Sequence, residues 1–216
     1  MNNRYAITGC AIALGGLLSG AAFAQEGAPA LTFFVTSVGL GDGANLGGLE
    51  DADAHCQSLA GAADAGDRTW RAYLSTIAMD GQPGVNARDR IGDGPWHNAA
   101  GVQVAASLDE LHSDAANINK ETALSEAGAV INGRGDDPNM HDILTGTLQD
   151  GTAAEMTCLN WTTSSDDQAT VVGHHDLVGN PEGINFWNYS HATRGCSQEG
   201  LVGTGGAGLL YCFAAD

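Results

Sequence analysis

Cysteine spacing constrains the fold of this 216-residue chain more than any other sequence feature. Beyond the N-terminal segment the chain holds four cysteines, Cys56, Cys158, Cys196 and Cys212. Their separations of 102, 38 and 16 residues include no C-x-x-C pair and fit no compact zinc site. An even number of cysteines in an oxidising compartment indicates two disulfides. Four cysteines allow three pairings, so the spacing alone leaves the connectivity open.

Residues 1–24 indicate the compartment. Arg4 precedes an apolar stretch that contains Cys10, and Ala22-Phe23-Ala24 forms a small-x-small cleavage site. The stretch is too short and too rich in glycine to span a membrane. We therefore expect a secretory signal peptide over residues 1–24, a single domain over residues 25–216, and a secreted or periplasmic destination.

The expected mature domain is strongly acidic. Removing 24 of 216 residues leaves 192, which suits one domain, and these carry 7 Lys and Arg against 26 Asp and Glu, a net charge of −19. Such a charge repels phosphate backbones and anionic lipids, so we expect no nucleic-acid or polyanion partner. No apolar run of the mature domain approaches 18 residues, so we expect no membrane insertion.

Local patterns predict a mixed α+β domain with many turns. Apolar residues at helical spacing predict a main helix over residues 49–60, with Cys56 on its inner face. Ser107 followed by Glu110 predicts a short capped helix, and residues 101–104 a hairpin arm. Residues 163–208 lack strong periodicity and are expected to form a long loop. Runs rich in β-branched and aromatic residues predict strands at 31–36, 68–75, 142–145, 156–162 and 209–213.

Four motifs carry a resemblance to a known fold. They are Gly-Gly-Leu-x-x-Ala-Asp-x-x-Cys-Gln over residues 47–57, Thr-Trp-Arg-Ala-Tyr-Leu-Ser over 69–75, Cys-x-x-Trp-Thr over 158–162, and Leu-Tyr-Cys-Phe-Ala over 210–214. In this order the chain resembles the endostatin-like branch of the C-type-lectin-like fold and secreted bacterial lectin-like proteins. The resemblance implies a twisted antiparallel sheet, one main helix and long loops braced by disulfides. It also implies nested disulfides, Cys56 with Cys212 and Cys158 with Cys196.

The segment from residue 160 to residue 191 carries the candidate binding residues. Amides and carboxylates pair with sugar hydroxyls, and an aromatic face covers the apolar side of a pyranose ring. An alternative interpretation buries Trp161 and Trp187 in the core and bonds the polar residues within the loop. We predict a ligand-binding surface made of Asn160, Asp166, Asp167, His174, His175, Asp176, Trp187, Asn188 and His191.

The same segment offers ligands for a metal ion. His174, His175 or His191 together with Asp176 suits zinc, and Asp166 with Asp167 suits calcium, so these two metals are the candidate cofactors. Neighbouring residues on an extended strand point to opposite sides. Only one of the adjacent histidines is therefore expected to face a given site.

The expected function is that of an exported lectin-like module that binds a neutral glycan or an extracellular matrix component. An adhesion or structural module that binds a protein partner is the alternative, although Arg134-Gly135-Asp136 is interpreted as a turn. A hydrolase with Ser164 or Ser165 as nucleophile is a minor alternative. No Gly-x-Ser-x-Gly motif occurs, so we do not expect an enzyme.

Overall fold

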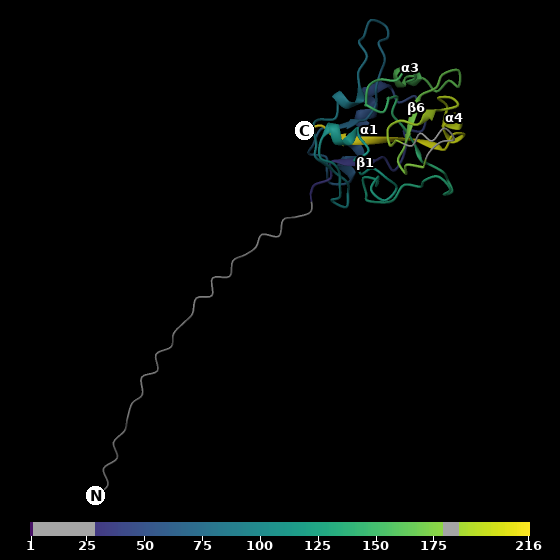
Figure 1. Ribbon diagram of the computed structural model, residues 1–216. Coiled ribbons are helices and arrows are strands. Elements are labelled where there is room, and N and C mark those ends of the chain that lie inside the picture. The colour runs from purple at the N-terminus through teal and green to yellow at the C-terminus, as the bar shows by residue number, and fades with distance from the viewer. Residues whose placement is uncertain (2–28, 179–185) are drawn as a thin grey trace.

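A computed structural model describes residue 1, residues 29–178 and residues 186–216 (Figure 1). Apart from Met1, the predicted signal peptide with its Cys10 lies outside the described residues. Within the described residues, no helix is both long enough and apolar enough to cross a membrane. The elements in chain order are β1 (Phe33–Val35), α1 (Gly48–Ala62), β2 (Trp70–Ala72), the 3-10 helix η1 (Ala87–Asp89), β3 (Trp96–His97), β4 (Gln103–Ala105), α2 (Leu108–Leu111), β5 (Asp142–Leu144), α3 (Cys158–Trp161), β6 (Val171–His174), β7 (His191–Ala192), α4 (Gln198–Val202) and β8 (Gly206–Ala214).

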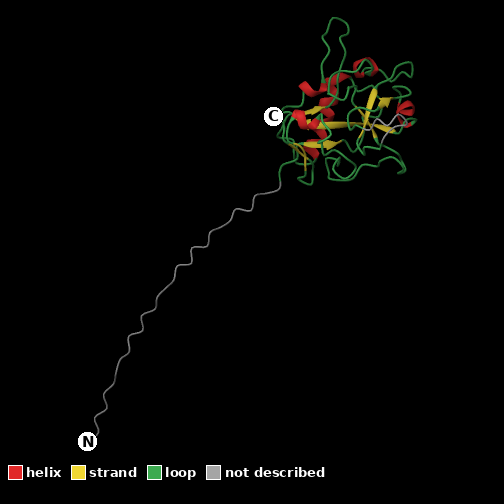
Figure 2. Ribbon diagram, in the orientation of Figure 1, coloured by secondary structure: helices red, strands yellow, loops and turns green. Residues whose placement is uncertain are grey.

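The main sheet is built around β8, its longest strand. β8 pairs antiparallel with β1 and β2 and parallel with β5, and β6 and β7 continue the sheet beyond β5. The α+β class is thus confirmed, but the expectation of a wholly antiparallel sheet is wrong. The chain between β5 and β8 is long enough to return in the same direction, which a parallel pair requires. Figure 2 shows that loops surround the strands. Strands β3 and β4 form a separate two-stranded sheet.

Helix α1 packs on the sheet and is fixed to it twice. Cys56 on its inner face forms a disulfide with Cys212 of β8, across 156 residues of chain. The buried carboxylate of Asp53 binds Arg90 and Arg71 at 2.7 Å each. The second disulfide joins Cys158 to Cys196, so both predicted pairs are confirmed. In the chain-entropy model, closures of this length each stabilise the fold by about 4–5 kcal/mol.

The predicted strand at 156–162 is wrong. Four consecutive residues, Cys158 to Trp161, have φ between 48° and 68° and form the left-handed turn α3. Asn160 bonds both the amide and the carbonyl of Ile77, and the buried indole of Trp161 donates to the carbonyl of Ser75 at 2.8 Å. Together with the Cys158 disulfide, these tertiary contacts offset the cost of left-handed backbone, about 1–2 kcal/mol per residue.

The expected loop over residues 163–208 also needs correction, because it contains β6, β7 and α4. These elements are short, between two and five residues each, so they leave little periodicity in the sequence. The short helix α2 begins as predicted, with the Ser107 hydroxyl accepting a hydrogen bond from the amide of Glu110.

Trp187 lies in the core and not on a binding surface. Its side chain is 4% exposed, and its ring packs against Tyr73 and Tyr211 at centroid distances of 4.7 and 5.0 Å. The indole N–H donates to the carbonyl of Leu111 at 2.9 Å. Because the ring has no free face, it is not available to cover a sugar, and this part of the predicted surface is corrected.

Replacing this indole tests its packing. We expect Trp187→Ala to lower the free energy of unfolding by about 3–5 kcal/mol, because it leaves a large cavity and an unpaired carbonyl at Leu111. Val202→Ala, at a side chain that is 59% exposed, is the control and should cost no more than about 0.5 kcal/mol. Urea unfolding measures both, and equal midpoints for the two variants would contradict the packing described.

Candidate metal centre

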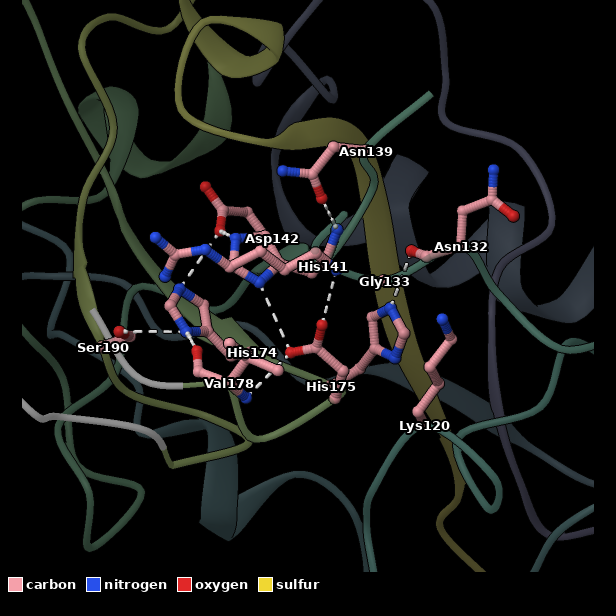
Figure 3. Close-up of polar contacts among 12 residues, drawn as sticks. Lys120, Asn132, Gly133, Asn139, His141, Asp142, His174, His175, Val178 and Ser190 are labelled. Atoms are coloured by element: carbon pink, nitrogen blue, oxygen red, sulfur yellow. Dashed lines mark hydrogen bonds and ion pairs between the residues drawn. The ribbon is translucent and has the colours of Figure 1, made fainter. Parts of the chain in front are cut away.

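Three histidines and one aspartate meet where strands β5, β6 and β7 lie side by side. Asp142 begins β5 and His141 directly precedes it, while His174 ends β6 and His191 begins β7. The antiparallel register pairs Asp142 directly with His174, and places His191 opposite Val172 on the other side of β6. Residues up to 50 positions apart in the chain therefore reach one point of the sheet. Figure 3 shows His141, Asp142 and His174 at this point.

The ligand atoms of this cluster have the spacing of a tetrahedral metal site. Asp142 Oδ1 lies 3.1 Å from His141 Nε2, 3.2 Å from His174 Nε2 and 3.6 Å from His191 Nε2. The Nε2 atoms of His174 and His191 are 3.1 Å apart. Atoms about 2.0–2.1 Å from a zinc ion lie about 3.3–3.4 Å apart at the corners of a tetrahedron. His141, Asp142 and His174 form a compact three-ligand group, with His191 beside it.

Each imidazole is oriented by a partner at its other nitrogen. His174 Nδ1 donates to the carbonyl of Val178 at 2.6 Å, and His191 Nδ1 lies 3.1 Å from the carbonyl of Ala192. His141 Nδ1 lies 3.3 Å from Asp176 Oδ1. In the neutral ring with its proton on Nδ1, the lone pair on Nε2 points into the cluster, which is how metal-binding histidines are arranged.

Asp176 positions His141, and two backbone amides hold the Asp176 carboxylate in place. Its Oδ2 accepts a hydrogen bond from the backbone N–H of Arg134 at 2.7 Å, and its Oδ1 accepts one from that of Val178 at 3.0 Å. Burial alone would raise the pKa of Asp176, but these bonds and His141 outweigh it and hold the pKa well below its ordinary range. Asp176 is therefore a charged acceptor for the His141 N–H at neutral pH.

The cluster buries negative charge that requires a cation. The Asp142 side chain is 1% exposed, and neither carboxylate oxygen has a hydrogen-bond partner among the described residues. Burial alone would raise the Asp142 pKa, but the surrounding histidines outweigh it and hold that pKa far below its ordinary value. Burial alone would lower the pKa of His141, but its contacts with Asp142 and Asp176 outweigh this effect and raise that pKa to about 9. A proton on His141 or a bound metal ion supplies the compensating charge.

A polar cleft of about 370 Å³ opens over the cluster. His191 forms part of its wall, with a side chain that is 26% exposed, whereas His174 is fully buried. Apart from Gly203, every described residue that lines the cleft has a polar or charged side chain. Besides the three histidines, the lining residues are Arg134, Asn139, Arg194, Gly203 and Thr204.

Two consecutive glycines let the cluster close against β8. A Cβ atom at Gly205, where φ is +117°, would lie 2.7 Å from Asn139 Nδ2 and 3.0 Å from His141 Cδ2. One at Gly206 would lie 3.2 Å from the Cβ of Asp142. The glycine-rich segment over residues 203–208 thus permits close backbone packing around the candidate ligands.

Only part of the predicted binding surface meets at this site. His174, Asp176 and His191 come together, whereas the ring of the adjacent His175 points away and contacts the carbonyl of Asn132 at 3.1 Å. That alternation is the one expected of neighbouring residues on a strand. His141 and Asp142 were absent from the predicted set. The only local signal for them is a His-Asp pair at the start of the strand predicted at 142–145.

The remaining predicted residues lie elsewhere. Asn160 is tied to Ile77, and the buried Asn188 donates to the hydroxyl of Tyr73 at 3.1 Å. Asp166 and Asp167 are exposed and line a different cleft, where Asp166 Oδ1 accepts from the Ser197 amide.

The residues of the serine hydrolase alternative do not contact one another as that hypothesis requires. Ser165 Oγ accepts a hydrogen bond from the amide of Asp167. The imidazoles of His174 and His175 contact other residues instead. Neither Ser164 nor Ser165 makes a hydrogen bond to either histidine within the part of the chain that is described.

No protein-family model matches this chain, and no match to it was found among curated proteins. The function is therefore argued from the geometry of the cluster and its cleft. The lectin-like resemblance stays a prediction beyond the α+β class.

The orienting role of Asp176 can be tested by removing its charge. We expect Asp176→Asn to weaken zinc binding by about 10–100-fold, because an uncharged amide replaces the carboxylate that accepts the His141 N–H and orients the ring. Isothermal titration with zinc chloride on chelator-stripped protein measures this. The matched control is Asp136→Asn on the neighbouring turn, whose carboxylate pairs with Lys120. The orienting role is wrong if the two variants bind zinc equally well.

Proposed function

We propose that this protein is an exported, zinc-dependent binding domain whose cleft holds an oxygen-bearing ligand over the metal. The observation that carries the proposal is the convergence of His141 Nε2 and His174 Nε2 on Asp142 Oδ1, at 3.1 and 3.2 Å. Two disulfides and the chemistry of the cleft support a binding module that works in an oxidising compartment.

The donor set favours zinc over calcium. Two or three imidazole nitrogens and one carboxylate oxygen are the ligands of tetrahedral zinc sites. Calcium requires six to eight oxygen ligands, and the cluster offers at most the two oxygens of Asp142. The imidazoles are also held in place by strands and by hydrogen-bond partners at Nδ1, as is usual for histidines that bind zinc.

The position of His191 favours ligand binding over a purely structural metal. His141, Asp142 and His174 are almost fully buried and would hold the ion on the side that faces the protein interior. His191 lies farther from Asp142 and lines the cleft, so in this proposal it stays outside the three-ligand set and the fourth corner of the tetrahedron faces the open side. A zinc ion with three protein ligands keeps one position for a ligand oxygen. There it supplies positive charge that polarises and anchors that oxygen.

Zinc titration of chelator-stripped protein tests the proposal. We expect one zinc ion per chain, no displacement by a large excess of calcium, and a loss of affinity of at least about 100-fold in both His141→Ala and His174→Ala, which remove a direct ligand. His55→Ala is the matched control. Its imidazole contacts the carbonyl of Val38, away from the cluster, and its zinc affinity should equal that of the unchanged protein.

Two results would refute the zinc site. One is stripped protein that binds no zinc although its near-ultraviolet circular dichroism shows native packing. The other is an equal loss of affinity in His55→Ala and His174→Ala, which would place the bound ion elsewhere. A melting curve for each variant separates loss of a ligand from loss of the fold.

A further inference from the structure

We infer that the ligand of the cleft is a sugar acid, whose single carboxylate bridges the zinc ion and the guanidinium of Arg194 while its hydroxyls bond the polar wall. This inference rests on the proposed function, because it uses the same metal centre. It replaces the neutral glycan expected from the sequence with an acidic one.

The first argument is the local charge of the cleft. The expected mature domain carries only seven Lys and Arg, and two of these, Arg134 and Arg194, line this one cleft. A zinc ion would balance the negative charges of Asp142 and Asp176, which leaves the two arginines as the net positive charge of the cleft. An otherwise acidic protein thus presents a small cationic site, which attracts an anionic group at short range.

The second argument is the state of Arg194. Its side chain is exposed, and Nη1 approaches Gly203 on the wall of the cleft. Within the described residues, its guanidinium makes no hydrogen bond or ion pair. By contrast, Arg71 and Arg90 bind Asp53. The five N–H donors of Arg194 are therefore available to a carboxylate, which guanidinium binds in a bidentate manner.

The third argument separates a sugar from a peptide. A peptide ligand gains affinity by burying apolar side chains, and among the described residues the cleft offers no aliphatic side chain and no Phe, Tyr or Trp to receive one. Asn139 and Thr204 instead supply an amide and a hydroxyl, which pair with hydroxyl groups. A volume of about 370 Å³ lies at the lower end of the range for small-molecule sites and suits one or two sugar rings.

The fourth argument limits the charge of the ligand. The −19 charge of the expected mature domain repels an extended polyanion, although one carboxylate held by a metal and an arginine is compensated locally. A single acidic sugar, or the acidic end of an otherwise neutral chain, fits both conditions. A phosphate dianion fits less well, because it brings twice the charge into the same field.

The test uses small probes of matched shape on zinc-loaded protein. Isothermal titration compares galacturonate and glucuronate with their neutral methyl esters, with galactose 6-phosphate, and with N-acetylglycine as a peptide-like carboxylate. We expect at least one of the two sugar acids to bind about 10-fold or more tightly than each other probe, because only it meets the charge and the hydroxyl partners together. Chelator-stripped protein should lose this binding.

Arg194→Gln provides the variant, and Arg68→Gln, at an exposed arginine beside Asp216, provides the matched control. We expect Arg194→Gln to lose the preference for the acid over its ester while zinc affinity stays unchanged, and Arg68→Gln to keep both. Equal binding of acid and ester, tighter binding of the phosphate or of N-acetylglycine, or no binding of either sugar acid would overturn the inference. In each of these cases a normal zinc titration shows that the metal site itself stands. If the protein binds no zinc, the proposed function is refuted, and the inference that rests on it is refuted as well.

Discussion

The pairing of strand β8 with its neighbours is the constraint on which the rest of the domain depends. β8 is buried along nearly its whole length and contacts β1, β2 and β5, while its Cys212 holds helix α1 by a disulfide. A strand buried on both faces needs partners on both edges, because unpaired backbone groups in the core are costly. The parallel pair with β5 meets this need along one edge. It also fixes where Asp142 lies, beside Gly206.

From that point the candidate metal centre follows by register. Once β5 lies against β8, its antiparallel pairing with β6 places Asp142 opposite His174, and β7 brings His191 to the far side of β6. Gly173 makes this packing possible, since a Cβ atom there would lie 1.9 Å from the carbonyl oxygen of Trp187. The buried Trp187 thus contributes indirectly, because its core packing holds the backbone that leads into β7. Trp187, which was predicted to touch the ligand, instead helps to position His191, which lines the cleft.

Features set by local spacing could be read from the sequence, and features set by tertiary pairing could not. The helix around Cys56 and the Ser107 cap depend on contacts within one or two turns, so periodicity and residue type reveal them. The left-handed turn at Cys158 depends on a disulfide and on Asn160 reaching a segment 83 residues away, so strand propensity misleads there. Asp142 and His174 stand 32 positions apart and meet only through strand register, which one sequence does not specify when strands are this short.

The chemistry of the centre follows from an imbalance that the fold itself creates. Removing a carboxylate from water without hydrogen bonds is costly, and Asp142 has none among the described residues. Structure alone does not require this charge, because an apolar residue of similar size would fill the same space without a counter-charge. The three imidazoles around Asp142 could supply a proton in the absence of metal, but each is also held with its Nδ1 occupied and its Nε2 turned inward. That orientation also suits a protonated ring, which would donate from Nε2 to Asp142, and it is the orientation required of a metal ligand. In the proposed zinc site, the buried aspartate is part of a preorganised set of ligands, and a bound ion would supply the stabilisation that the protein groups alone leave incomplete.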